Sequence, residues 1–275
     1  MFGPLFRYEL IRLARRGLQP RLRAAFALLL LAVLLLAYLA AFPGVGPLQL
    51  LTHIDEPLTT ESAGRFGERF VSAFLLVQVA AVVLMTPAVV VGAVADERDR
   101  RAFDQLLATP LSAWEVLGGK LAARLVFLGT VLLTGLPVAV LSVFFGGVDV
   151  GRLLAGYAIA LCTLPSLGAY SLYAAVRRPT TGGALAQAYA VALFLSAFGL
   201  VCSCFVLPAF VSPIGTTWVI LSGWPGLFSP NPADAGLAVL CYAIVHFTVA
   251  AVSLGAAVSA LRDPEEPPRP TAVLS

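Results

Sequence analysis

Residues 71–95 read VSAFLLVQVAAVVLMTPAVVVGAVA, an unbroken stretch without a single Asp, Glu, Lys or Arg. A helix needs about 20 apolar residues to cross the ~30 Å hydrocarbon core of a bilayer. The strands of a membrane β-barrel instead alternate with a period of two over about ten residues. This stretch is apolar on every face and longer than that, so it predicts one membrane-spanning helix.

Five further long apolar runs occur in the 275-residue chain, at residues 24–42, 121–145, 153–176, 184–209 and 235–261, and only the run 121–145 contains a charged residue, Arg124. Hydrophobic residues make up 59% of the chain and charged residues 12%. Soluble domains have roughly 45–50% and about 25%. The composition therefore excludes an ordinary soluble enzyme, a disordered chain and a coiled coil. We predict an all-α polytopic membrane protein with six transmembrane helices, which form a single transmembrane domain over residues 1–262.

The 18 Lys and Arg residues are distributed unevenly between the two sides of these six runs. Fifteen lie in the N-terminal segment, around the loop after residue 95, or after the fourth and sixth runs. The other three, Arg65, Arg69 and Arg152, lie on the opposite side. Cytoplasmic loops carry the excess of positive charge, so both termini are expected in the cytoplasm. The first run exceeds the apolar segment of a signal peptide, typically about 7–15 residues, which favours a retained span over a cleaved signal.

Residues 1–20 precede the first run and predict an amphipathic interfacial helix. Phe2, Phe6, Leu10 and Leu13 share one helical stripe, and arginines occupy mostly other faces. Such a helix lies on the cytoplasmic leaflet with its arginines near anionic headgroups. The alternative is a simple basic cluster that orients the first span. At the other end, residues 263–275 are rich in proline and predict a disordered cytoplasmic tail.

The outer segment 209–235 is too apolar for a solvated loop and too broken for another span. It contains Trp218 and Trp224, a residue type that prefers the membrane interface. We expect a short re-entrant or interfacial element here, because lipid cannot satisfy the hydrogen bonds of a broken backbone. A frayed end of the fifth span is the alternative.

Motifs for catalysis, nucleotides and metals are missing from the sequence. The pattern GxxxxGK[ST] does not occur, since Gly118-Gly119-Lys120 lacks its first glycine and is followed by Leu121. The chain therefore has no loop to cradle ATP phosphates. His53 has only Asp55 and Glu56 nearby, too few ligands for a metal site. We expect no catalytic residue, cofactor or metal in this chain. The four cysteines lie within apolar runs and are interpreted as small buried hydrophobes: Cys162, Cys202, Cys204 and Cys241.

His246 lies within the sixth run. An ionisable residue at membrane depth is a functional candidate by default. Three roles are open for it: packing as a neutral hydrogen-bonded ring, lining a substrate path, or binding a ligand. The six runs contain no carboxylate, which argues against an ion-driven transporter, although backbone carbonyls can coordinate sodium.

The loop 96–120 reads DERDRRAFDQLLATPLSAWEVLGGK. Acidic residues at 96, 97 and 99 are interpreted as the start of a helix whose dipole they complement. The next features are an apolar stripe at Phe103, Leu106 and Leu107 and a break at Thr109-Pro110. Ser112 and Glu115 then have the spacing of a capping box. From these residues alone, a helix lying on the membrane surface is an equal alternative to a partner-binding element.

This loop resembles the signature loop of type-2 ABC transporter permeases, approximately E-R-x-x-G-T-x-x-x-L-L-x-T-P-x-S-x-x-x-I-x-x-G-K. It departs from that pattern at Arg101-Ala102, where Gly-Thr is usual, and at Val116, where Ile is common. The matching residues are Glu97, Arg98, Leu106, Leu107, Thr109, Pro110, Ser112, Gly119 and Lys120.

The resemblance implies the membrane subunit of an ABC exporter in the cell (inner) membrane. Two such subunits would associate, as a homodimer or with a paralogue, and each would engage a cytoplasmic ATPase that holds ATP and Mg²⁺. The loop would be the coupling element, with Phe103, Trp114 and Glu115 added to the matched residues. A membrane anchor that transports nothing and an ion-driven secondary transporter are the alternative functions.

Overall fold

The computed structural model describes residues 4–15, 17–41, 60–99, 112–144, 149–201, 211–222 and 232–262. Within these ranges every regular element is an α-helix, which confirms the predicted all-α class. The helices are α1 (Pro4–Arg15), α2 (Leu18–Ala41), α4 (Thr60–Asp99), α6 (Ala113–Leu133), α7 (Leu136–Phe144), α8 (Val150–Arg177), α9 (Thr181–Val201), α11 (Pro213–Ser222) and α12 (Pro232–Arg262).

Five segments are long and apolar enough to cross a membrane: Gln19–Ala41, Gly64–Val94, Ala113–Val140, Val150–Arg177 and Gly236–Leu261. They coincide with five of the six predicted runs, so the chain is a multi-pass membrane protein. In α9 the apolar part is shorter, Thr181–Ala197. The predicted fifth span, 184–209, continues into residues that the structure does not describe. The sixth crossing therefore stays a prediction.

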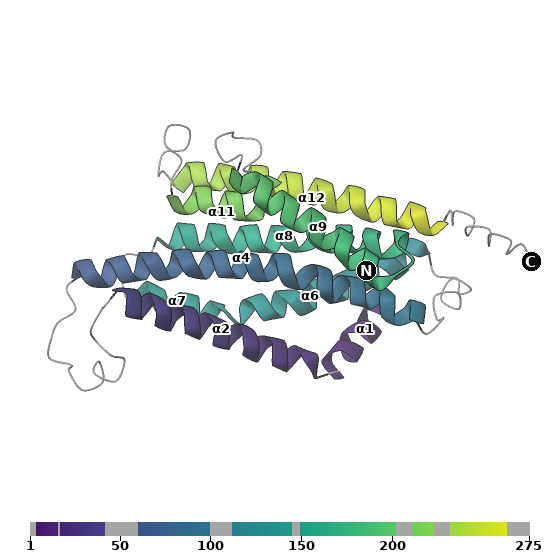
Figure 1. Cartoon of the computed structure of the whole chain (residues 1–275), viewed down its shortest axis with the longest axis horizontal. Helices are drawn as coiled ribbons and strands as arrows, with labels where there is room; N and C mark the ends of the chain where they lie inside the picture. Colours follow the sequence, from purple (N-terminus) through teal and green to yellow (C-terminus); the bar gives the residue numbers. More distant parts are fainter. Residues whose placement is uncertain are drawn as a thin grey trace, which may run out of the picture.

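The long helices lie side by side and run alternately in opposite directions (Figure 1). Helix α4 lies at the centre and packs against α2, α8 and α9, while α12 packs mainly along α8. Gly156 allows α4 and α8 to approach closely, because a Cβ atom at this position would collide with the side chain of Leu75. Helix α1 and the end of α12 lie at the same end of the bundle (Figure 1).

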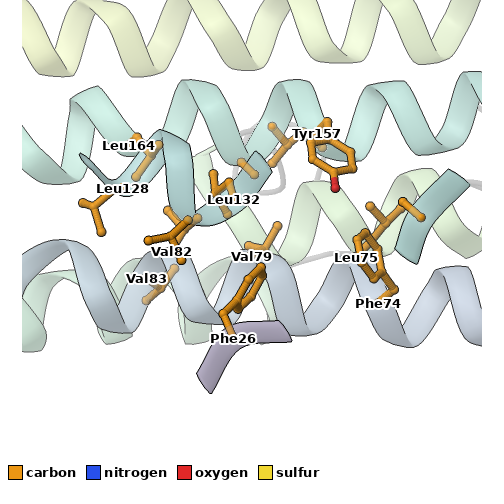
Figure 2. Packing of buried hydrophobic residues seen from close by; sticks show 14 of the residues in the cluster. Phe26, Phe74, Leu75, Val79, Val82, Val83, Leu128, Leu132, Tyr157 and Leu164 are labelled. Carbon is orange, nitrogen blue, oxygen red and sulfur yellow. The ribbon is translucent and has the colours of Figure 1, made fainter. Parts of the chain in front are cut away.

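The main hydrophobic core lies where α2, α4, α6 and α8 meet (Figure 2). Phe26 of α2, Val79 of α4, Leu132 of α6 and Leu164 of α8 are all buried in it. Aromatic rings extend this core along α4. The ring centroids of Phe74 and Tyr157 are 6.1 Å apart, within the range of favourable aromatic pairs. The core thus joins elements from the whole length of the chain into one bundle.

The third run contains two helices where the sequence predicted one. Helix α6 ends at Leu133, Thr134 and Gly135 form a turn, and α7 begins at Leu136. Pro137 explains the break, because it has no N–H to donate to the carbonyl of Leu133 and its ring crowds that carbonyl. The apolar pattern alone did not separate the two helices, since the turn residues are themselves compatible with a span.

Helix α1 confirms the predicted helical N-terminal segment and ends beside Gly17, whose positive φ of 64° suits glycine. The apolar stripe of α1 was expected to face the membrane surface, but in the structure it faces other helices. Leu13 is buried in the main core, and Phe6 and Leu10 pack against that core. The stripe is therefore covered by protein, chiefly by α6, and the helix presents its other face outward.

The outer segment between α9 and α12 contains the ten-residue helix α11, which packs against α9, α8 and α4. Trp218 of this helix is half exposed, whereas Trp224 lies outside the described residues. The predicted short element therefore exists as a helix. Its re-entrant or interfacial placement stays a prediction. The predicted tail 263–275 also lies outside the described residues.

Candidate functional site

The loop that resembles the permease signature begins where α4 ends and finishes where α6 begins. Both ends lie at the same end of the bundle, close to α1 (Figure 1). The structure describes the residues up to 99 and again from 112. The site is therefore built from its two flanks.

Ser112 and Glu115 form the predicted capping box at the start of α6. The Ser112 Oγ accepts a hydrogen bond from the backbone N–H of Glu115 at 3.3 Å. In return, the backbone N–H of Ser112 donates to Glu115 Oε2 at 3.0 Å. A reciprocal cap satisfies two donors that a helix start otherwise leaves unpaired. The cap fixes the residue at which the loop becomes a rigid helix.

The acidic residues at the other flank do not start a helix, so that prediction is wrong. Asp96, Glu97 and Asp99 fall in the last turn of α4, which continues without interruption from the membrane segment. Neither proline nor glycine occurs between residues 93 and 99, so nothing in the backbone ends the helix earlier. These residues therefore continue the helix of the membrane segment and do not lie at the start of a new one.

Some of the remaining predicted coupling residues lie in the described flanks of the loop, and the others lie in the segment 100–111, which the structure does not describe. Glu97 and Arg98 belong to the last turn of α4. Trp114 is half exposed on the first turn of α6. Five predicted residues lie outside the described part of the chain: Phe103, Leu106, Leu107, Thr109 and Pro110. Their grouping on one apolar face stays a prediction.

The first turns of α6 change from an exposed start to a buried helix. Val116, Leu117, Gly119 and Lys120 are all buried, in contrast to Trp114. Lys120, the last residue of the resemblance, is only 1% exposed. The lysine and glycine of the matched motif therefore lie inside the bundle, whereas Ser112, Trp114 and Glu115 are exposed at the start of α6.

One turn beyond Lys120, Arg124 contacts the N-terminal helix. Its Nη2 lies 3.8 Å from Oε2 of Glu9 in α1. The other oxygen of Glu9 lies 3.5 Å from Nη1 of Arg12. Both Glu9 and Arg124 are buried. Sequence reasoning missed this contact, although Glu9 is the only carboxylate within the first 54 residues and could have been singled out for that reason.

His246 lies in a polar cluster between α8 and α12. Ser166 Oγ lies 2.5 Å from its Nδ1, and its ring stacks on Tyr242 with the centroids 4.0 Å apart. Tyr242 in turn shares a hydrogen bond of 2.6 Å with Thr163. His246 is 5% exposed, and its Nε2 has no hydrogen-bond partner among the described residues. This geometry fits a packed, hydrogen-bonded ring, and a role in a substrate path stays a prediction.

The comparisons with known proteins bear on residues 47–233, which match the model of the family described as ABC-2 family transporter protein. A search among curated proteins gives no match. The matched range covers more than half of the chain and includes the loop and both of its flanks. It spans α4 through α11 and thus most of the apolar bundle. The chain belongs to the ABC-2 transporter family and is a permease, the membrane component of an ABC transporter.

Proposed function

We propose that the chain is the permease subunit of an ABC exporter whose coupling element is the loop 96–120. The observation that carries the proposal is the reciprocal cap at Ser112. It starts a rigid helix at the end of the loop that resembles the permease signature. Helix α4 ends at the same end of the bundle. A partner that moves the loop would therefore act on two long helices at once. The direction of transport is inferred from the resemblance of the loop to type-2 permeases.

The energy would come from a separate ATPase subunit. This sequence has no phosphate-binding loop, so ATP and Mg²⁺ are assigned to the partner. We propose a dimer of permease subunits, with two identical copies or one paralogue, each bound to its own ATPase. Nucleotide on the ATPase would bias two arrangements of the bundles, and the substrate would pass between them. The absence of carboxylates from the six predicted spans favours an apolar or amphiphilic substrate.

The proposed location is the cell (inner) membrane. The chain would cross it six times, with both termini in the cytoplasm. The unequal distribution of Lys and Arg supports this orientation, because 15 of the 18 lie on one side. The loop 96–120 then faces the cytoplasm, where an ATPase can reach it.

The experiment is co-purification of the ATPase with the tagged permease from detergent, for the parent and for Leu106→Asp. In the proposed groove, Leu106 would be an apolar anchor, and loss of such an anchor costs ~2 kcal/mol or more. A buried carboxylate without a partner adds to that cost. We expect ATPase binding to fall on the order of 30-fold or more. Membrane insertion should stay unchanged, since the residue lies outside the predicted spans.

Arg100→Ala is the matched control in the same loop. Charges at an interface set the encounter rate and register more than the affinity, so its effect should be small and dependent on salt. The competing view places the leucines on the membrane surface and predicts unchanged ATPase binding by Leu106→Asp. Full ATPase binding and full ATP-driven turnover by Leu106→Asp, at expression equal to the parent, would show that the coupling assignment is wrong.

A further inference from the structure

The N-terminal helix α1 is attached to α6 through a buried charge. Glu9 points away from solvent, with its side chain 3% exposed, and its carboxylate faces the guanidinium of Arg124. The side chain of Arg124 is 9% exposed. Glu9 thus lies between Arg12 of its own helix and Arg124 of α6. Loss of its charge removes a buried electrostatic contact between the two helices, which is destabilising.

The covalent connection of α1 is of a different kind. The chain passes from α1 to α2 through Gly17, whose left-handed backbone turns the two helices away from each other. Apart from its two chain neighbours, no atom of the described residues lies within 4 Å of the position of a Cβ at Gly17, so there is open space at this corner. Leu13 and the stripe beside it pack into the core that α6 shares. Helix α1 is thus hinged to α2 at one glycine and held along its side by α6.

Helix α6 follows the candidate coupling loop in the chain. Twelve residues separate the cap at Ser112 from Arg124, which is about 18 Å of continuous helix at a rise of 1.5 Å per residue. The first turns of α2 form hydrogen bonds to α6 beyond Arg124, toward the C-terminal end of α6. Gln19 donates to Thr130 at 3.0 Å, and Arg23 donates to Thr134 at 3.0 Å. A displacement of the cap would therefore reach the Glu9 contact first.

We propose that Glu9 is a positioning residue of the transporter, which makes α1 move with α6 when the ATPase moves the loop. The inference rests on the proposed coupling role of that loop. The carboxylate of Glu9 binds neither nucleotide nor substrate. It holds α1 against Arg124, so that the cationic outer face of α1 follows α6 by rotation about Gly17. Arg7 and Arg15 are exposed on that outer face.

The test is pulsed EPR on the permease–ATPase complex in lipid, with the native cysteines replaced. One spin label is placed at Tyr8, which is 62% exposed on α1, or at Gly118 near the start of α6, where a Cβ meets no atom within 4 Å among the described residues outside the helix's own backbone. This choice leaves the cap at Ser112 intact. The second label is always at Ser259, an exposed position on α12. Distances are measured without nucleotide and with ATP trapped by vanadate. With Glu9 present, both the Tyr8–Ser259 and the Gly118–Ser259 distances should shift on trapping.

Glu9→Gln should reduce the Tyr8 shift and retain the Gly118 shift, because the apolar stripe of α1 still contacts the core but the charged contact with α6 is lost. Arg7→Gln is the matched control, because it removes an exposed charge from the same helix, and it should retain both shifts. Glu9→Asp keeps the charge and should also retain both. A merely structural role of Glu9 would lower the yield of folded protein without separating the two shifts.

Two outcomes overturn the inference alone. One is a Gly118 shift without a Tyr8 shift in the complex that keeps Glu9, which can be read even if Glu9→Gln fails to fold. The other is a Tyr8 shift of unchanged size in Glu9→Gln. If Gly118 itself does not move on trapping, or if no ATPase binds the chain, the proposed coupling function fails, and this inference fails with it.

Discussion

Replacing Gly156 with alanine tests the close contact between α4 and α8. The added Cβ would lie within 3.0 Å of three atoms of the Leu75 side chain or at that limit, and Leu75 is fully buried. Overpacking of a core costs about 1–3 kcal/mol. The better helix propensity of alanine returns about 1 kcal/mol. The net destabilisation is therefore about 0–2 kcal/mol, or roughly up to 8 °C in Tm.

The decisive measurement is a double-mutant cycle on thermal unfolding of the purified protein in detergent. Leu75→Ala alone should cost about 2–5 kcal/mol, because it leaves a cavity. In the double variant the methyl group added by Gly156→Ala enters that cavity. The effect of Gly156→Ala should then change sign and become stabilising, with a coupling of about 1–3 kcal/mol, equal to the overpacking cost that disappears. Gly129→Ala is the matched control, since nothing lies within 4 Å of its Cβ position. Additive effects of the two changes would refute the packing argument.

Tyr242→Phe should lower the stability by only about 0.5–1.5 kcal/mol in the same assay, because Thr163 keeps its 2.7 Å hydrogen bond to the carbonyl of Ile159. Tyr8→Phe, at an exposed position, serves as the control. An equal loss in both variants would contradict a stabilising hydrogen bond between Tyr242 and Thr163. For the topology, single cysteines at Ser62 and Ser275 in a cysteine-free background should differ in their reaction with an impermeant maleimide on intact cells. Ser62 should be labelled and Ser275 protected until the cells are opened, and the reverse pattern would exclude the proposed orientation.

The sequence predicted the helical spans well because burial in lipid imposes one requirement on every residue of a span. Five long apolar helices coincide with predicted runs for this reason. The capping box at Ser112 was also predictable, because both of its partners lie within four residues and the geometry is local. Helix ends were less predictable. The carboxylates at residues 96–99 suit the start of a helix by charge, yet α4 continues through them.

The contacts between distant segments could not be predicted from the pattern. Glu9 meets Arg124, and Ser166 meets His246, only because the bundle brings together helices that are far apart in the sequence. A stripe such as Phe6, Leu10 and Leu13 looks the same whether lipid or another helix covers it. The sequence therefore identified the apolar face of α1 but not the helix that covers it. The isolated carboxylate of Glu9 was the residue that could have pointed to a basic partner in another helix.

The ion pair between Glu9 and Arg124 has a consequence for how the protein is made. The two residues are 115 positions apart, so the ribosome delivers the partner of Glu9 long after Glu9 itself. At about 5–20 residues per second, the delay is roughly 6–23 s. During this interval the nascent α1 has neither Arg124 nor the rest of α6 to cover its stripe. It must wait at the surface of the bilayer, where its arginines and apolar residues can both be accommodated. The amphipathic character of α1 thus suits two successive environments, first lipid during synthesis and then α6 in the finished bundle.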